Sequence, residues 1–164
     1  MTEQQVAEDA YSTIPLTQGQ VAIVDTADYG WLSQFKWYAQ KSKRDTFYAA
    51  RSGGWRKPII RMHREILGCI KGEIGDHKNR NQLDNRRHNL RKATPSQNSF
   101  NRMISRKSLT GIKGVHLHVS GKWQAKVYIN GKRKTIGSFK TKEEAGNAYA
   151  TAARLIYGEF ACLG

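Results

Sequence analysis

The stretch that decides the fold is GDHKNRNQLDNRRHNL, residues 75–90, which continues as RKATPSQN through residue 98. Four polar residues stand out in it: Asp76, His77, Asn89 and Asn98. Twelve positions separate His77 from Asn89, and nine separate Asn89 from Asn98. A strand-like approach precedes Asp76, and a Thr-Pro pair that can cap a helix precedes Asn98. The pattern predicts a strand, a long polar loop and a helix that carry these four side chains.

These residue types suit the hydrolysis of a phosphodiester bond. That reaction needs a base to activate water, a metal ion to neutralise developing charge, and a group that holds the base at the right angle. Histidine is the usual base near neutral pH, and a carboxylate with an amide oxygen is a suitable ligand pair for Mg²⁺. Taken singly, each residue also has a structural reading, because Asp and Asn form turns and a lone histidine can be a surface residue.

The same run resembles the HNH, or ββα-metal, nuclease motif in the subgroup found in phage intron-encoded homing endonucleases. The pattern covers about residues 60–102, reaching upstream through MHREILG (62–68) and downstream through NLR (89–91). The resemblance implies that His77 is the general base and that Asn89 orients it and fixes its tautomer. It also implies that Asp76 and Asn98 bind one divalent metal, Mg²⁺ or another cation such as Mn²⁺, and that products carry 5′-phosphate and 3′-hydroxyl ends. The family often has histidine at the last position, and without paired CxxC motifs no structural zinc is expected.

Positive charge is concentrated in the later part of the chain. The net charge is +15, and residues 61–164 contribute 21 basic and 7 acidic side chains, a net of +14. Such a field favours a polyanionic partner, here double-stranded DNA. A merely solubilising surface is the alternative. The candidate phosphate contacts near the motif are Arg80, Arg86, Arg87 and Arg91.

The C-terminal part predicts three strands and a helix. The strands are expected at 115–119, 122–129 and 132–139, with Asn130-Gly131 as a strong hairpin signal. Thr141 and Glu144 form a capping box, and the helix is expected to run to Tyr157 and stop at Gly158. The apolar face of the helix is expected to comprise Ala145, Ala148, Tyr149, Ala152, Leu155 and Ile156. The sheet face that packs on it is expected to comprise Val115, Leu117, Ala125, Val127 and Ile136.

Residues 111–162 resemble the plant-type AP-two/ERF DNA-binding domain, carried by KGV (113–115), GKW (121–123), IGSF (136–139) and the start of the helix. The resemblance implies that DNA is contacted by strand positions, which fall on Lys113, His116, His118, Lys126, Tyr128, Arg133 and Thr135. Several differ in type from the family, since an acid is common where Lys126 stands and an aromatic where Thr135 stands. That puts the family's sequence preference in doubt, though not DNA binding itself.

The expected fold class is α+β. It comprises a disordered tail (1–13), a β-rich N-terminal unit (14–60), the nuclease motif (61–105), a linker (106–112) and a three-stranded antiparallel sheet packed on one helix (113–164). The absence of an apolar run near 18 residues excludes a membrane span, and the polar, acidic N-terminus is not a signal peptide. Two lone cysteines suit a reducing cytoplasm. The resemblance to homing endonucleases implies a phage or mobile-element protein that acts inside the host cell, and a monomer is expected.

The sequence therefore predicts a metal-dependent DNA endonuclease, of the site-specific homing type. The alternative from another class is a catalytically inactive, sequence-specific DNA-binding regulator that kept the nuclease fold, against which the intact four-residue set argues. An RNA-binding protein is a third reading, but the exposed paired aromatics of sheet-stacking RNA modules are missing.

Overall fold

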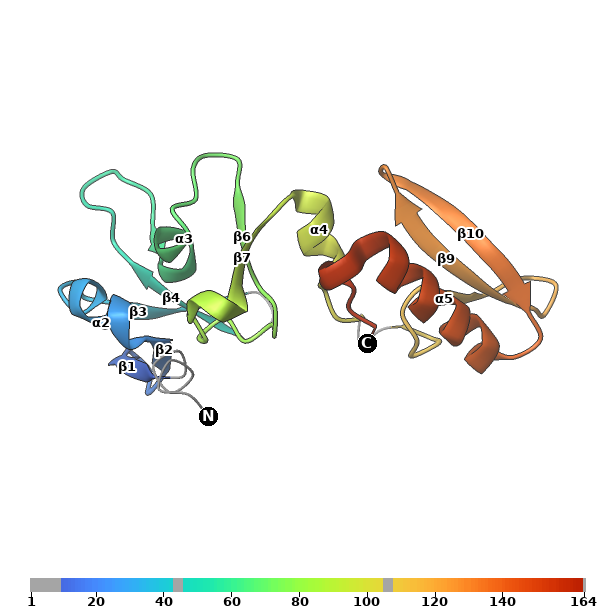
Figure 1. Ribbon diagram of the computed structural model, residues 1–164, viewed down its shortest axis with the longest axis horizontal. Helices are drawn as coiled ribbons and strands as arrows, with labels where there is room; N and C mark the ends of the chain where they lie inside the picture. The colour runs from blue at the N-terminus through green and yellow to red at the C-terminus, as the bar shows by residue number, and fades with distance from the viewer. Residues whose placement is uncertain (1–9, 43–45, 105–107, 164) are drawn as a thin grey trace, which may run out of the picture. The chain divides into compact units, whose positions relative to one another are not determined.

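The computed structural model of the chain describes residues 10–42, 46–104 and 108–163 (Figure 1). The chain divides into two compact units between Thr94 and Pro95. Both units combine antiparallel strands with helices, which confirms the predicted α+β class. The linker expected at 106–112 lies within the second unit, and its residues 106 and 107 fall outside the described ranges.

The first unit is built from small antiparallel sheets and short helices (Figure 1). Its elements in chain order are β1 (Tyr11–Pro15), β2 (Val21–Asp25), α2 (Thr26–Leu32), β3 (Tyr38–Lys41), β4 (Phe47–Arg51), β5 (Ile60–Arg61), α3 (Met62–Ile66), β6 (Ile74–His77), η1 (Arg87–Asn89) and β7 (Leu90–Ala93). β1 pairs with β2, β3 and β5 flank β4, and β6 pairs with β7.

Three predictions for this unit need correction. Tyr11 to Thr13, expected in the disordered tail, belong to β1 because they pair with the alternating apolar strand β2. The spacing of Trp31, Leu32 and Phe35 predicts a helix over residues 28–35, but α2 ends at Leu32 and Phe35 is exposed. Strand β7 was not predicted, because its basic residues do not read as a strand. It is nevertheless paired along its whole length with β6.

One hydrophobic core joins the N-terminal strands to α3 and β7. Its buried members extend from Ile14 in β1 to Leu90 in β7. The backbone adds a direct tie, since Ile23 N–H donates to Leu83 O at 2.8 Å and Asn85 N–H donates to Ile23 O at 2.7 Å. Strand β2 therefore holds the polar loop between β6 and β7 in a fixed shape.

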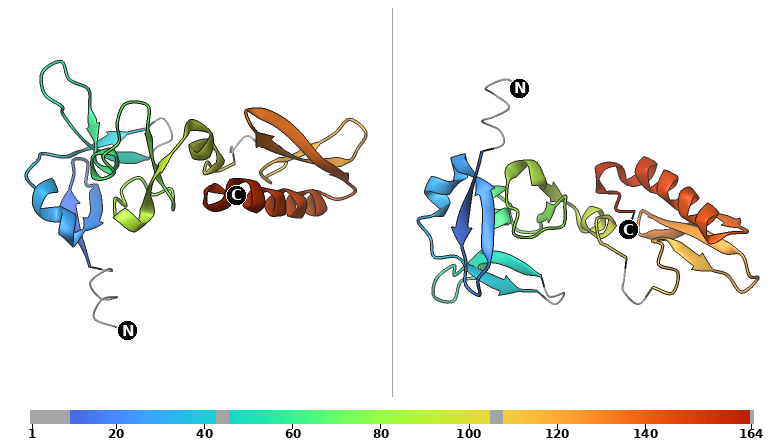
Figure 2. Two further views of the ribbon diagram at one scale, coloured as in Figure 1. Left: turned by 45° about the horizontal axis from the view of Figure 1, so that its top comes forward. Right: turned by 90° about the horizontal axis from the view of Figure 1, so that it is seen from below.

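The second unit contains the predicted three-stranded sheet and its helix (Figure 1, Figure 2). Its elements are α4 (Pro95–Phe100), β8 (Val115–Leu117), β9 (Trp123–Ile129), β10 (Lys132–Phe139), α5 (Lys142–Tyr157) and η2 (Gly158–Phe160), with β9 at the centre of the sheet. The capping box is confirmed: Thr141 Oγ1 accepts from Glu144 N–H at 3.1 Å, and Glu144 Oε2 accepts from Thr141 N–H at 3.2 Å. The sequence predicts a helix from Pro95 to about residues 103–106; α4 starts at Pro95 but already ends at Phe100.

The buried stripe of α5 differs from the predicted one. Ala145, Tyr149, Ala153 and Tyr157 are buried, at intervals of four residues along one side of the helix. Leu155 and Ile156 were expected in this stripe but are 82% and 43% exposed. The side of the helix that faces the sheet carries small and aromatic side chains. A prediction based only on the apolar character of each residue therefore placed the buried side of α5 wrongly.

The inner face of the sheet is mostly as predicted. Val115, Ala125 and Val127 are buried against the helix. Ile136 and Leu117 were assigned to the same face but are exposed. The register between β9 and β10 shifts between Thr135 and Gly137, which removes Ile136 from the regular alternation, and Leu117 is the last residue of the edge strand β8.

A glycine substitution should separate backbone strain from steric conflict in this unit. Gly114 has φ +73°, and a Cβ added there would lie 2.1 Å from the ring of the buried Tyr149. Gly121 has a similar φ, +77°, but no atom within 4 Å of such a Cβ. We expect Gly121→Ala to cost about 1–2 kcal/mol through φ alone, and Gly114→Ala to cost distinctly more. Hydrogen exchange of the α5 and β9 amides measures both, and equal losses would contradict the packing of Tyr149 on Gly114.

No helix in the described ranges has the length and apolar character needed to cross a bilayer.

Candidate functional site

Asp76 and His77 are the last two residues of β6, as the strand-like approach predicted. Their backbone partners across the β6–β7 pair are Arg91 and Leu90. Successive residues of a strand point to opposite faces, so the two side chains reach different partners. Both are buried, at 6% and 4% exposure. A carboxylate and an imidazole are thus placed side by side in a site largely removed from water.

Asp76 forms a buried ion pair with Arg91. Arg91 Nε and Nη2 each lie 2.9 Å from Asp76 Oδ2, and the two side chains are 8% and 7% exposed. Loss of either partner would leave the other charge buried. Arg91 was predicted as a phosphate contact; the structure places its guanidinium on Asp76, where it fixes the orientation of the carboxylate.

His77 packs among two other aromatic rings. Its ring centroid lies 4.7 Å from that of His63, in an edge-on arrangement, and 6.3 Å from that of Tyr48. His63 also packs on Tyr48 at 5.6 Å, which agrees with the expectation that His63 is structural. A Cβ on Gly75 would lie 2.5 Å from His63 Cδ2. Because Gly75 has no side chain, the His63 ring has room to lie beside His77.

Asn85 sets the tautomer of His77. Its side chain has no exposed surface, and its Oδ1 lies 3.3 Å from His77 Nε2. Asn85 Nδ2 donates to Leu83 O at 3.1 Å, which identifies Oδ1 as the atom facing the ring. Because a carboxamide oxygen only accepts, the neutral ring carries its proton on Nε2 and its lone pair on Nδ1.

Burial keeps both histidines neutral. The pKa of His77 is lowered by burial, which outweighs the hydrogen bond that His77 donates to Asn85 and the charges of Asp76 and Asp84, all of which act in the opposite direction. The pKa of His63 lies well below its ordinary value, because of burial first and then nearby positive charge. A histidine that stays unprotonated near neutral pH has the form that a general base requires.

The buried His63 should make the first unit sensitive to acid. The unfolded chain takes up a proton near the ordinary pKa of 6.5, whereas the folded site resists it. Stability contributed by neutral His63 is therefore complete above about pH 6.5 and is lost as pH falls toward the lowered pKa. We expect His63→Phe, which keeps a ring but does not titrate, to lose less stability between about pH 7 and pH 5. Urea denaturation at both pH values measures this, and parallel losses in the two proteins would refute it.

Asn89 organises the loop that carries Asn85. It is 3% exposed, its Oδ1 accepts from Asn79 N–H at 2.9 Å, and its Nδ2 donates to Asp84 O at 2.7 Å. Asn79 Nδ2 also donates to Asp84 Oδ2 at 2.8 Å. Asn89 was expected to orient His77; these contacts act on the loop, and Asn85 contacts the ring. Nothing in the local sequence distinguishes Asn85 from its neighbouring asparagines, all of which read as turn formers.

Two more of the predicted phosphate-contacting arginines, besides Arg91, are held by acids. Arg87 Nε and Nη2 each donate to Asp28 at 2.7 Å, and the Arg87 backbone N–H donates to Asp25 Oδ2 at 2.7 Å. Arg86 makes a two-point contact with Asp84, at 2.8 and 2.9 Å. The Arg87 side chain is still 59% exposed. Arg80 is exposed as well, in a turn with φ +66°.

The two residues predicted to bind a metal offer a carboxylate and an amide. Asp76 lies in the first unit, and Asn98, half-buried on α4, belongs to the second. No group of three or more His, Cys, Asp and Glu side chains in the described parts of the chain forms a metal-binding cluster. Oxygen donors suit a hard divalent cation that keeps several waters, and a carboxylate can hold an arginine through one oxygen and a cation through the other. The donor chemistry therefore fits Mg²⁺ or Mn²⁺.

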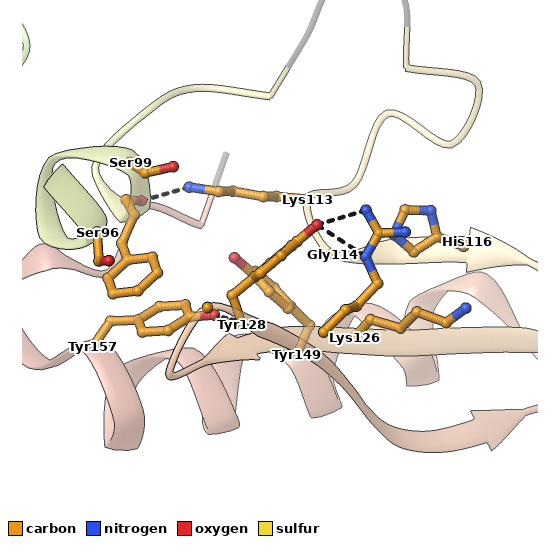
Figure 3. A pocket seen from close by; sticks show the side chains of 12 residues that line it. Ser96, Ser99, Lys113, Gly114, His116, Lys126, Tyr128, Tyr149 and Tyr157 are labelled. Atoms are coloured by element: carbon orange, nitrogen blue, oxygen red, sulfur yellow. Dashed lines mark hydrogen bonds between the residues drawn. The ribbon is translucent and has the colours of Figure 1, made fainter.

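The outer face of the second unit's sheet collects most of the predicted C-terminal contacts (Figure 3). The register places His116 beside Gln124, Lys126 beside Thr135, and Tyr128 beside Arg133. His118 lies beyond the end of β8, where its Nδ1 is 2.8 Å from Ser120 Oγ.

Lys113 has a different setting from the strand residues. Its Nζ donates to Phe100 O and Arg102 O, both at 2.6 Å (Figure 3). The ammonium therefore closes the C-terminal end of α4 against the start of the sheet segment. Any contact of Lys113 with a phosphate would compete with these two carbonyl groups.

Comparison with known proteins finds a relative that spans most of the chain. A protein of Acanthamoeba polyphaga mimivirus, named as an uncharacterized HNH endonuclease, is 33% identical over 150 residues, which cover 88% of this chain and 74% of the relative. No protein-family model and no solved structure matches the chain. The aligned length exceeds the length of either unit, so the similarity includes residues of both units.

Proposed function

The chain belongs to the HNH endonuclease family, and we propose that it cuts double-stranded DNA by metal-dependent hydrolysis of a phosphodiester bond. The observation that carries this proposal is the pair Asp76 and His77 at the end of β6. One is fixed by Arg91 and the other is held in a single neutral tautomer by Asn85. Products with 5′-phosphate and 3′-hydroxyl ends are part of the proposal.

His77 acts as the general base. Its lone pair on Nδ1 takes the proton of a water molecule as the oxygen of that water attacks phosphorus. The imidazolium that forms keeps its hydrogen bond from Nε2 to Asn85 Oδ1, and the negative charges of Asp76 and Asp84 favour the protonated form. These contacts strengthen as positive charge develops on the ring, so they assist the proton transfer itself.

Asp76 and Asn98 are the residues that would hold the metal ion. A divalent cation such as Mg²⁺ or Mn²⁺ supplies positive charge for the scissile phosphate and the departing oxygen. Arg91 keeps the Asp76 carboxylate in a fixed direction, in the manner of the hydrogen-bonded partners that orient metal ligands generally. Loop positions Arg80, Arg86 and Arg87 then offer positive charge to neighbouring phosphates.

The C-terminal sheet binds the DNA, as the sheet of an AP-two/ERF-type domain would. A cationic strand face can enter the major groove, which is wide enough for a β-ribbon. Lys126, Arg133 and His116 lie on that face, and the charges of Lys126 and Arg133 make binding dependent on salt. A monomer with one such active site would nick one strand in each encounter. The proposal includes site-specific cleavage, in which the protein recognises one target sequence in DNA as homing enzymes do.

Replacing Asn85 should slow cleavage without weakening DNA binding. Asn85→Leu removes the partner of His77 Nε2 and frees the ring to rotate and change tautomer, so we expect kcat to fall about tenfold or more with KM for DNA unchanged. Asn79→Ala is the matched control, because it removes a contact with Asp84 in the same loop without touching the ring. Steady-state cleavage kinetics separate the two. An equal fall in kcat in both variants would show that Asn85 only shapes the loop and does not position His77.

The chemistry is tested by the ends of cleaved DNA. We expect cleavage in Mg²⁺, none after chelation, and recovery when Mg²⁺ or Mn²⁺ is added back. Cut fragments should be resealed by a DNA ligase without prior end treatment, because that requires 5′-phosphate and 3′-hydroxyl groups. Cleavage that persists in chelator, or ends that need repair before ligation, would contradict the proposed mechanism.

A further inference from the structure

A cavity of about 350 Å³ lies in the second unit, on the outer face of its sheet (Figure 3). Its walls include Phe100, Tyr128, Tyr149 and Tyr157, and Lys126 and Arg133 contribute positive charge to its lining. Its volume is near the lower end of the range of small-molecule sites. α4, which is not a part of the three-strand sheet or its helix, helps to enclose it through Ser96 and Ser99.

The aromatic walls are fixed in position. The rings of Phe100 and Tyr157 stack with centroids 3.9 Å apart and planes 13° apart. Tyr157 and Tyr149 are almost fully buried, and the Tyr157 hydroxyl accepts a hydrogen bond from Tyr128 N–H at 2.7 Å. Tyr128 itself is 46% exposed, so its ring is available at the mouth of the cavity. Rigid aromatic surfaces bind a planar group with little loss of side-chain freedom.

The positive groups converge on the same opening. Arg133 donates to the Tyr128 hydroxyl through Nε at 3.2 Å and through Nη2 at 2.8 Å. Lys126, Arg133 and His116 line the same cavity, and the pKa of His116 is lowered by burial first and then by the charges of Arg133 and Lys126. Positive charge beside flat aromatic surfaces matches a group that carries both a planar ring and a phosphate.

We infer that this cavity receives one unstacked nucleotide of the bound DNA, with its base against the exposed ring of Tyr128 and its phosphate near Lys126 and Arg133. The inference rests on the proposed function and adds a specific feature to it. In an intact duplex the bases present only their edges to a protein surface such as this cavity. A base turned out of the helix fills it, and stacking on aromatic rings stabilises such a base.

The test compares paired DNA with DNA that already contains an unstacked nucleotide. Two duplexes of one sequence are used, one fully paired and one with a single-nucleotide bulge, and the full chain is titrated against each by fluorescence anisotropy. We expect the wild type to bind the bulged duplex about tenfold more tightly. Tyr128→Leu, which fills similar space without an aromatic face, should abolish the preference, whereas Tyr128→Phe should keep it.

The outcomes separate this inference from the proposed function. Equal binding of the two duplexes by the wild type would overturn the cavity's role and leave the nuclease proposal standing. A bulge preference that survives Tyr128→Leu would also overturn it. Failure to bind either duplex would instead contradict the proposed function, and the inference with it. Melting curves for the two Tyr128 variants confirm that folding is retained at this partly exposed position.

Discussion

Replacing His77 with glutamine lowers the rate of DNA cleavage about 100- to 10,000-fold and leaves DNA affinity unchanged. Glutamine can donate from its amide nitrogen to Asn85 Oδ1 and so preserves the contact that positions the ring. It cannot accept a proton from water at neutral pH. A single-turnover cleavage assay gives the rate, and anisotropy on uncleaved DNA in Ca²⁺ gives the affinity.

The choice of glutamine guards against a folding defect. His77 is 4% exposed and packs on His63, so alanine would leave a cavity as well as remove the base. His88→Gln is the matched control, because His88 is exposed in the same loop. A His77→Gln protein that cleaves as fast as the wild type would remove His77 from the mechanism, and a loss of rate in His88→Gln would show that the loop as a whole is sensitive.

Replacing Asp76 with alanine abolishes cleavage and destabilises the first unit by about 3–5 kcal/mol. The loss of stability arises because the Arg91 guanidinium, 8% exposed, is left without its carboxylate. The loss of cleavage arises because Asp76 is the proposed metal ligand on β6. Urea denaturation measures stability, and cleavage is assayed well below the denaturation midpoint of the variant.

A double variant separates these two effects. Replacement of a buried ion pair by apolar residues of similar volume is often neutral or stabilising, so Asp76→Leu combined with Arg91→Met should regain most of the lost stability. It should not regain cleavage. A double variant that cuts DNA would exclude Asp76 from the active site, and a fully stable Asp76→Ala protein would show that the ion pair contributes nothing to folding.

Local features of the fold could be predicted because their causes are local. The Asn130-Gly131 hairpin is confirmed, with both residues at positive φ, 51° and 73°, as a tight two-residue turn requires. The capping box at Thr141 and the helix stop at Gly158 are confirmed as well. Each depends on residues within a few positions of one another.

Contacts between distant residues could not be predicted. Arg87 binds Asp28, 59 residues earlier, and Arg91 binds Asp76, 15 residues earlier. Composition shows only an excess of basic residues and cannot distinguish an arginine that faces phosphate from one that holds a carboxylate. Asn85 was overlooked for the same reason, since its importance comes from β2, which fixes the loop through Ile23 O.

The candidate site was therefore predicted in part. The pattern placed Asp76 and His77 together at a strand end, and the structure shows why they stay there. Their supporting residues, Arg91, Asn85 and His63, became visible only when the chain was folded. Asn89, expected to orient His77, contacts the loop instead of the ring, and the metal-binding role of Asn98 stays a prediction.

The measurement that tests the central claim most directly begins with DNA that the protein is known to bind. Sequences retained by the wild-type protein from a randomised duplex library in Ca²⁺ are cloned into supercoiled plasmid and incubated with the protein in Mg²⁺, with and without chelator. We predict nicked or linear plasmid that appears only with the metal and is absent with His77→Gln. Tight, sequence-specific binding of these plasmids with no cleavage by the wild type would contradict the account and identify the chain as an inactive DNA-binding regulator.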